Sequence, residues 1–420
     1  MKENKSLELK AEINRTYLKT VSAFANYQSG SIFFGVADDG AIVGVMDAQE
    51  SKLNIENAIN DSINPQPVYN LTTRIIEGKE VVELHVEKGY HTPYLYKNKA
   101  YRRADTSTIE VDSLEFKRLV LAGSNINYEE LPSNKQDLTF LYLGKKLKEV
   151  VAIDELNKDI LKTLDLYTDR EGYNLAANLL SDNGSLRSSG VDIARFGKDI
   201  NTIEFRKTIA DCSILEQYDV GVALYKQYYQ YEKIEGMERN LKERIPSEAF
   251  REALANALVH CEWDVNGYVQ IAMYNDRIEI ISPGGLPSGV TEEDYLQSKF
   301  SILRNPIIGN VFFRLRLIEQ FGTGIARIKQ AYEDGLQQPR FKFTEGSISV
   351  VLPVSEDTGV VLDEDDKLIL RYIREGNGVD RLTLEQISGF KKSKVIRIVN
   401  NLIERGLIEK VGRGPATFYK

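Results

Sequence analysis

The chain contains few residues that bind metals or form disulfides, and it has no long apolar run. Among its 420 residues are two cysteines, Cys212 and Cys261, and three histidines, none spaced as a Cys/His zinc site requires. No segment approaches the ~20 consecutive apolar residues of a membrane-spanning helix. The charged stretch Met1–Lys10 lacks the apolar core of a signal peptide. We therefore expect no membrane partner and a location in the reducing cytoplasm.

Charge is distributed unevenly along the chain. Hydrophobic residues make up 42% and charged residues 28%, as in a globular protein, and the length predicts about three domains. The formal net charge of −8 excludes a uniformly basic nucleic-acid-binding surface. From Thr383 to Lys420, however, eight Lys and Arg residues outnumber three Asp and Glu residues, a net charge of +5. This asymmetry predicts a small basic C-terminal module.

Hydrophobic patterns and turn residues divide the chain into four blocks of an α+β multidomain protein. We predict blocks at residues 1–123, 124–240, 241–354 and 360–420. In the first block, Ser31–Val36 predicts a buried strand, and Asp38-Asp39-Gly40 predicts a tight turn into a second strand, Ala41–Val45. Further strands are predicted at 72–76, 81–86, 268–274 and 277–281.

The C-terminal block has the pattern of a winged helix-turn-helix. Three short helices are predicted, the last over Lys391–Arg405, followed by strands at 407–411 and 416–419. The start of the third helix is basic, and such a helix start contacts base edges or phosphates in this motif. A protein-binding winged helix is the alternative. The DNA contacts that we predict are Lys391, Lys392, Lys394, Arg397 and, at the tip of the wing, Arg413.

One helix in the third block carries polar residues at a regular spacing. Glu252, Asn256 and His260 recur every four residues, on a different face from the apolar residues of the same helix. An amide oxygen at Asn256 can ligate Mg²⁺, and a carboxylate at Glu252 can activate water. A solvated polar face is the alternative interpretation of this spacing.

Two glycine-rich elements follow this helix. Ser282-Pro283-Gly284-Gly285 comes after a predicted strand, and Gly322-Thr323-Gly324 opens a helix where backbone amides can bind phosphate.

Together with Arg304-Asn305-Pro306, these elements resemble the divergent RecG-related branch of the Bergerat-fold (GHKL) ATPases. The resemblance implies an α/β sandwich that binds ATP and magnesium. Glu252 would be the catalytic base and Asn256 the magnesium ligand. His260, Gly284 and Gly285 would border the nucleotide, and Gly322, Thr323 and Gly324 would hold its phosphates.

The sequence departs from this family at one position and excludes one activity. The family's Asp-x-Gly-x-Gly element supplies an Asp that binds the adenine amino group, whereas this chain has Ser282-Pro283-Gly284-Gly285 there. Binding and hydrolysis of ATP are therefore left open. No Gly-x4-Gly-Lys-Ser/Thr loop occurs in the sequence, which argues against a motor helicase.

The first block also carries an ordered series of motifs. Glu8-Leu9-Lys10, Lys19–Asn26, Gly30–Val36, Asp38–Gly40 and Tyr101-Arg102-Arg103 resemble the Schlafen-type, Alba-like (AlbA) domain. By analogy with the nucleases of that family, Glu3, Glu8 and Asp38 would bind a divalent metal for phosphodiester cleavage. Binding of RNA or DNA through Arg102 and Arg103 is a second possibility, and a structural or oligomerising role is a third.

These elements lead to one main hypothesis and two alternatives. The main hypothesis is a nucleotide-responsive, DNA-binding transcriptional regulator. RNA is a further candidate partner. The regulator is expected to form a homodimer or a higher homo-oligomer, because winged-helix regulators often bind paired half-sites. The first alternative is a metal-dependent, Schlafen-like nuclease that acts on tRNA, other RNA or DNA, in defence. The second is a scaffold whose nucleotide pocket has degenerated.

Overall fold

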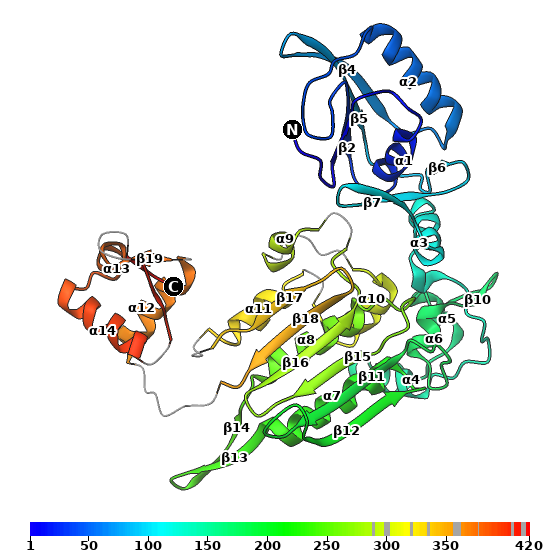
Figure 1. The fold of residues 1–420 in the computed structure, drawn as a ribbon. Helices are drawn as coiled ribbons and strands as arrows, with labels where there is room; N and C mark the ends of the chain where they lie inside the picture. Colours follow the sequence, from blue (N-terminus) through cyan, green and yellow to red (C-terminus); the bar gives the residue numbers. More distant parts are fainter. Residues whose placement is uncertain are drawn as a thin grey trace. The chain divides into compact units, whose positions relative to one another are not determined.

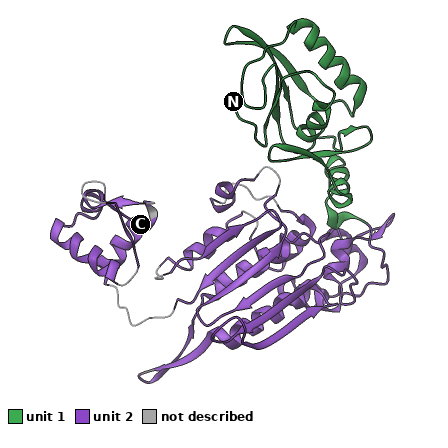
Figure 2. Cartoon of the chain, in the orientation of Figure 1, with its two compact units in different colours: residues 1–131 green, residues 132–420 purple. Residues whose placement is uncertain are grey.

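The computed structural model describes residues 1–287, 290–297, 303–319, 322–333, 337–355, 363–376, 378–404, 407–412 and 417–420. These residues form two compact units, Met1–Leu131 and Pro132–Lys420 (Figure 2). Among the described helices, none is both long enough and apolar enough to pass through a bilayer.

The first unit is built on a four-stranded sheet (Figure 1). Its main elements are β1 (Leu7–Lys10), α1 (Tyr17–Tyr27), β2 (Gly30–Phe34), α2 (Ala48–Ser62), β4 (Tyr69–Ile76) and β5 (Lys79–Val86). The strand order is β1-β2-β5-β4, with β1 and β2 parallel and the other pairs antiparallel. Because side chains alternate along a strand, Ile32 and Phe34 pack in the core with α1 and α2, whereas Phe33 packs on the opposite face.

Short ribbons complete the first unit. They are β3 (Ile63–Asn64) with β6 (Leu95–Tyr96), and β7 (Tyr101–Ala104) with β8 (Ser107–Glu110), followed by α3 (Ser113–Gly123) and a 3-10 turn at Tyr128–Glu130. The predicted hairpin at 72–86 is present as β4 and β5. At the predicted turn, Gly40 has φ +88° and Val36 bridges Ile42, but the second strand predicted at Ala41–Val45 does not form.

The second unit contains a six-stranded sheet. Its strands are β11 (Gly190–Phe196), β12 (Ile203–Ala210), β15 (Val269–Met273), β16 (Arg277–Pro283), β17 (Arg340–Phe343) and β18 (Ser347–Pro353). Their order is β12-β11-β15-β16-β18-β17, and β11 with β15 is the parallel pair among them. Strands from both sides of residue 240 share this sheet, so the boundary predicted there divides one hydrogen-bonded layer.

Two long helices cover one face of this sheet (Figure 1). They are α7 (Ile214–Tyr229) and α8 (Ser247–Val259), which contact β11 and the pair β16–β18, respectively. The ring of Tyr225 on α7 stacks on Phe250 of α8 at 4.5 Å between centroids. Most of α8 is buried, since α10 (Pro306–Arg314) and α11 (Gly324–Gln330) also pack on it. A helix enclosed on several sides holds its side chains in fixed positions.

The C-terminal end of α8 is fixed by residues that follow it by about forty positions. The side-chain amide of Asn305 donates to the carbonyls of Val259 and Cys261, at 2.8 and 2.9 Å. The Arg304 guanidinium donates to the carbonyls of His260 and Gly285, at 2.5 and 2.6 Å. The bonds to Val259 and His260 satisfy carbonyls that a helix end leaves without an intrahelical donor, and the bond to Gly285 ties the loop after β16 to the same arginine.

The C-terminal module, residues 363–420, contains three helices and a small sheet. Its elements are α12 (Glu364–Glu375), β19 (Val379–Asp380), α13 (Arg381–Ser388), α14 (Lys392–Glu404), β20 (Lys410–Val411) and β21 (Phe418–Tyr419). The strand order is β19-β21-β20. One face of α14 is apolar and buried, because Val395, Ile398, Val399 and Leu402 pack in the core of the module.

The remaining elements flank the large sheet. They are α4 (Leu141–Val151), α5 (Lys158–Thr163), β9 (Tyr167–Thr168), β10 (Gly172–Tyr173), α6 (Leu175–Leu180), β13 (Gln230–Glu235), β14 (Glu238–Glu243) and α9 (Glu292–Leu296).

Candidate functional site

The predicted polar face of α8 lies against the start of α11. The side-chain amide of Asn256 donates to Oε1 of Glu252 at 3.2 Å, one helical turn away. A Cβ atom added to Gly324 would stand 2.3 Å from that Oε1 and 2.7 Å from the Asn256 amide nitrogen. A side chain at position 324 would therefore require the ends of the Glu252 and Asn256 side chains to shift. The structure brings Glu252, Asn256 and Gly324 together, and their roles with a nucleotide stay a prediction.

Glu252 is a buried carboxylate with few polar neighbours. Burial raises its pKa, whereas the hydrogen bond from Asn256 and the positive charge of Arg327 on α11 act in the opposite direction. Arg327 also forms an ion pair with Glu319, at 3.3 Å. The sequence analysis missed Arg327, although its place three residues after Gly324 puts it near the same face of α11.

His260 lies at the C-cap of α8 and forms part of a small apolar cavity. Burial, with a further contribution from the charge of Arg304, lowers the pKa of His260 to about 4. The imidazole is therefore neutral near pH 7 and brings no positive charge to a phosphate group.

The cavity next to Asn256 and His260 has a volume of only about 20 Å³. That is room for about one water molecule. Its walls include Tyr295 from α9 and Ile325 and Ile328 from α11, packed against Ile280 of β16. The Glu252 carboxylate and the Asn256 amide near Gly324 provide oxygen atoms of the type that magnesium prefers. The cavity beside them is nevertheless too small for a nucleotide in this conformation.

The first glycine pair has a packing role. Gly284 has φ +102°, and a Cβ atom there would meet Glu262 and Arg304 within 2.6 Å. A Cβ atom on Gly285 would meet the backbone of 344–345 within 2.8 Å. Both glycines thus allow the loop after β16 to pack against its neighbours. Gly322, with φ +66°, and Thr323 lead into α11, and their phosphate contacts stay a prediction.

The carboxylates predicted for metal-dependent cleavage are not brought together. Glu8 is buried, accepting from Arg103 at 2.5 Å and from Thr20 at 2.6 Å and pairing with Lys10 at 2.8 Å. Glu3 instead accepts from the backbone amide of Leu9. Asp38 is exposed in the turn. Across the described part of the chain, no three His, Cys, Asp or Glu side chains form a group that could hold a metal ion.

The two adjacent arginines of β7 have different environments. The side chain of Arg103 is 4% exposed, and beyond Glu8 it donates to Thr108 and to the carbonyl of Asn4. The side chain of Arg102 is 36% exposed and pairs with Glu115 at 3.1 Å. Arg103 is therefore a structural residue of the first unit, whereas Arg102 is accessible to a nucleic acid.

The basic residues of the third helix in the C-terminal module also differ. Lys391, Lys392 and Arg397 are exposed. Lys394 pairs with Asp365 of α12 at 2.6 Å and lies over the Phe390 ring, so its charge is already neutralised. Arg413 lies outside the described residues.

Comparison with protein families gives two separate matches. Residues 3–112 match the family model "Schlafen, AlbA_2", and residues 266–352 match "Putative ATP-dependent DNA helicase recG C-terminal". Both matches support the resemblances that the motifs indicated. Together, the two matches indicate a nucleic-acid-related protein with an ATPase-like segment. The second match is consistent with ATP binding.

Solved structures give a match over nearly the whole chain. The DIP2311 protein from Corynebacterium diphtheriae is 18% identical, with a TM-score of 0.52, over 99% of this chain and 91% of that chain. This similarity concerns the fold alone. The N-terminal domain of a RecG-related protein from Nitrosomonas europaea is 22% identical over 26% of this chain and 83% of that chain, with a TM-score of 0.21. A search of curated proteins found no match.

Replacement of Glu252 by Gln is expected to change how stability depends on pH. The raised pKa means that the folded state prefers the protonated carboxyl, so wild-type stability falls as pH rises through that pKa. Glu252→Gln should therefore exceed wild type in free energy of unfolding at pH 7 and equal it below about pH 4, where unfolded Glu is also protonated. Urea titrations across this range measure the difference.

Glu248→Gln is the matched control, because Glu248 is an exposed carboxylate in the first turn of the same helix. The charge of Glu248 makes a smaller contribution than burial to the raised pKa of Glu252, so Glu248→Gln should keep the fall in stability with pH that Glu252→Gln abolishes. Identical profiles for Glu252→Gln and Glu248→Gln would contradict the buried environment of Glu252.

The two arginines of β7 predict opposite outcomes on truncation. Arg103→Ala removes the main partner of a buried carboxylate and should reduce the free energy of unfolding by about 3–5 kcal/mol. Arg102→Ala removes a more exposed ion pair and should change it by about 1 kcal/mol or less. Chemical denaturation of both variants measures the contrast, and equal losses would contradict the structural role of Arg103.

Proposed function

We propose that the chain is a DNA-binding regulatory protein whose RecG-related segment responds to a nucleotide. The observation that carries this proposal is the position of α11. Its first residue, Gly324, contacts Glu252 and Asn256, while Glu333, just after its end, pairs with Arg371 of α12 at 3.5 Å. One short segment thus touches both the candidate nucleotide site and the C-terminal module.

The C-terminal module is the proposed DNA-binding part, as a winged helix-turn-helix. Its helices α13 and α14 are joined by a short turn at Gly389, which has φ +70°. Lys391, Lys392 and Arg397 stay accessible at the start of α14 and can contact phosphate or base edges. Lys394 is left out of this contact set because of its pair with Asp365.

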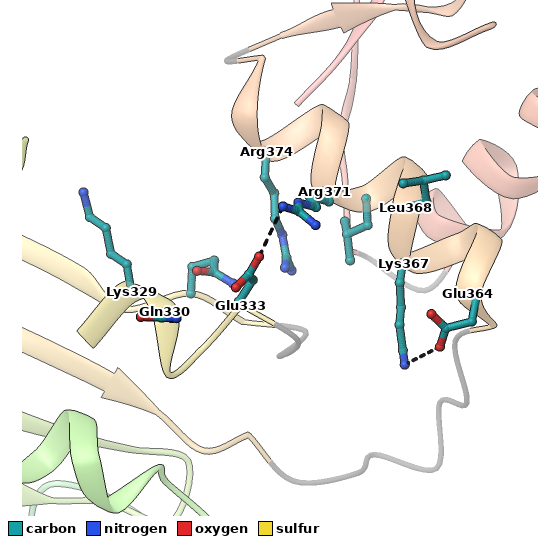
Figure 3. A pocket seen from close by; sticks show the side chains of 10 residues that line it. Lys329, Gln330, Glu333, Glu364, Lys367, Leu368, Arg371 and Arg374 are labelled. Atoms are coloured by element: carbon teal, nitrogen blue, oxygen red, sulfur yellow. Dashed lines mark hydrogen bonds and ion pairs between the residues drawn. The ribbon is translucent and has the colours of Figure 1, made fainter. Parts of the chain in front are cut away.

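The contact between α11 and α12 borders a charged cavity (Figure 3). The cavity measures about 530 Å³, and its walls carry Lys329, Glu333, Lys367, Arg371 and Arg374. A movement of α11 would change the distance between Glu333 and Arg371. It would therefore strengthen or weaken the ion pair that links this segment to α12. This provides a physical route from the site at Glu252 to the DNA-binding helices.

The closed cavity next to Asn256 sets a condition on this route. A nucleotide needs far more room than about 20 Å³, so it can bind only a conformation in which α9 and α11 have moved away from α8. A ligand that binds one conformation better than another shifts the population towards it. In this proposal, the nucleotide therefore favours an arrangement in which the pair between Glu333 and Arg371 is altered.

The first prediction concerns DNA. The protein should bind duplex DNA with an affinity that falls steeply with salt, because phosphate contacts release counterions. Lys392→Ala with Arg397→Ala should weaken binding and flatten the plot of log affinity against log salt by about 2. Fluorescence anisotropy at several salt concentrations measures the slope, and RNA of equal length tests the choice of nucleic acid.

Lys145→Ala with Lys148→Ala is the control, since these exposed residues of α4 give the same change in net charge. An unchanged slope in the α14 variant, or equal changes in both variants, would overturn the assignment of α14 as the DNA-binding helix.

The second prediction concerns coupling. ATP with magnesium should change the DNA affinity of the wild type at least ~5-fold, the lower end of usual allosteric couplings. Asn256→Ala should abolish the change by loss of nucleotide binding. Glu333→Ala should abolish it while nucleotide binding, measured by calorimetry, persists. Glu171→Ala, an exposed carboxylate elsewhere in the unit, should behave as wild type.

Absence of saturable ATP binding in the wild type would overturn nucleotide sensing and leave DNA binding to be judged on its own. Retained coupling in Glu333→Ala would overturn the route through α12.

A further inference from the structure

A second surface of the molecule has no place in this proposal. The strands β13 and β14 form a hairpin that projects beyond the large sheet (Figure 1). It is a two-stranded ribbon in which β13 and β14 pair only with each other among the described strands. Isolated two-stranded ribbons are marginally stable in water, so a long exposed one usually has a partner.

One face of the ribbon carries exposed apolar side chains next to charged ones. Residues directly opposite each other point to the same face, and the register pairs Glu232 with Leu241 and Ile234 with Arg239. Ile234 is 70% and Leu241 62% exposed, and Met237 at the turn is fully exposed. Exposed apolar side chains that are diagonal neighbours on one face, as Ile234 and Leu241 are, offer a small contact area for another protein.

The charges of the ribbon argue against nucleic acid as that partner. From Gln230 to Glu243 the sequence holds four Glu residues against three Lys and Arg residues. A β-ribbon that enters a DNA groove needs an excess of positive charge.

The backbone of β14 is arranged to accept another strand. The amide of Arg244 donates to the carbonyl of Tyr229, and hydrogen-bonded pairs alternate along an antiparallel ladder. The amide and carbonyl groups of Arg239, Leu241 and Glu243 therefore point to the outer edge of the ribbon. An edge strand of this kind is a template for another chain.

We infer that this edge pairs with β14 of a second copy of the chain, antiparallel and with Leu241 opposite Leu241. Within each copy, Arg239 pairs with Glu232 at 3.0 Å, and Glu243 accepts from the Ser247 amide at 2.7 Å and from the Gln230 amide at 2.9 Å. A two-fold axis at Leu241 places Arg239 of each copy opposite Glu243 of the other, in addition to these contacts. Axes at Arg239 or Glu243 would oppose like charges, and an axis at Asn240 would place Leu241 opposite Arg239. The Leu241 register alone joins apolar to apolar and positive to negative.

The result is a continuous four-stranded ribbon across the dimer. Leu241 from both copies lies at its centre, with Ile234 of each copy as a diagonal neighbour on the same face. The pairing uses the same patch of both chains, as an isologous two-fold interface requires. This inference is independent of the proposed function, because it uses no residue of the nucleotide or DNA sites.

The test measures association of the full-length chain. Sedimentation velocity of the wild type at ~1–100 μM should show a dimer. Leu241→Lys should raise the dissociation constant at least ~30-fold, as loss of a central interface residue does. Ile75→Lys is the matched control, because Ile75 on β4 of the other unit is 76% exposed, compared with 62% for Leu241. Thermal melts of Ile75→Lys should match the wild type, and those of Leu241→Lys should match it at concentrations below the wild-type dissociation constant, where no dimer contributes to stability.

Cross-linking tests the proposed register, in which Leu241 of one copy lies opposite Leu241 of the other. A short bis-maleimide should cross-link Leu241→Cys into a species of two chains, whereas Ile75→Cys should stay a single chain. The wild type measures the background from Cys212, which is partly buried, and buried Cys261. A monomeric wild type, a dimer that Leu241→Lys leaves intact, or no cross-link at position 241 would each overturn the inference.

Discussion

The second unit depends on the close packing of α11 against α8. Gly324 has no side chain where Glu252 and Asn256 approach, so both side chains keep their positions beside α11. This packing brings a buried carboxylate, an amide and Arg327 into one small region. It also closes the neighbouring cavity with Ile325 and Ile328. The same contact thus assembles the candidate site and shuts it, so any ligand has to compete with apolar packing.

The spacing of the helical residues placed them on one face, whereas the surroundings of the glycines could not be predicted from the sequence. Spacing of four along α8 was enough to place Glu252 and Asn256 on one face, since helix geometry is regular. Gly284 and Gly285 were assigned to a nucleotide, but their neighbours are Arg304 and the 344–345 backbone. A glycine in a sequence indicates that a backbone needs space, and only the tertiary structure tells what occupies that space. The size of the cavity had no signal in the sequence at all.

In the first unit, the roles of two neighbouring arginines also depend on the tertiary structure. Arg102 and Arg103 are neighbours in sequence, and a basic pair of this kind predicts a nucleic-acid contact. Alternation along β7 turns one side chain towards Glu115 and the other into the buried cluster around Glu8. The strands themselves followed from local pattern, as at 72–86, whereas the strand predicted at 41–45 failed because a single bridge from Val36 to Ile42 replaces it.

The bonds from Arg304 and Asn305 to the end of α8 affect which fragments of the chain can fold on their own. They join a helix that precedes β15 to residues that follow β16, so both strands lie inside a closed loop of chain. The family match begins at residue 266, after α8. A fragment starting there would lose α8, β11 and β12, and would leave Ile278 and Ile280 uncovered. The smallest autonomous piece is therefore considerably longer than the conserved-family segment that it contains.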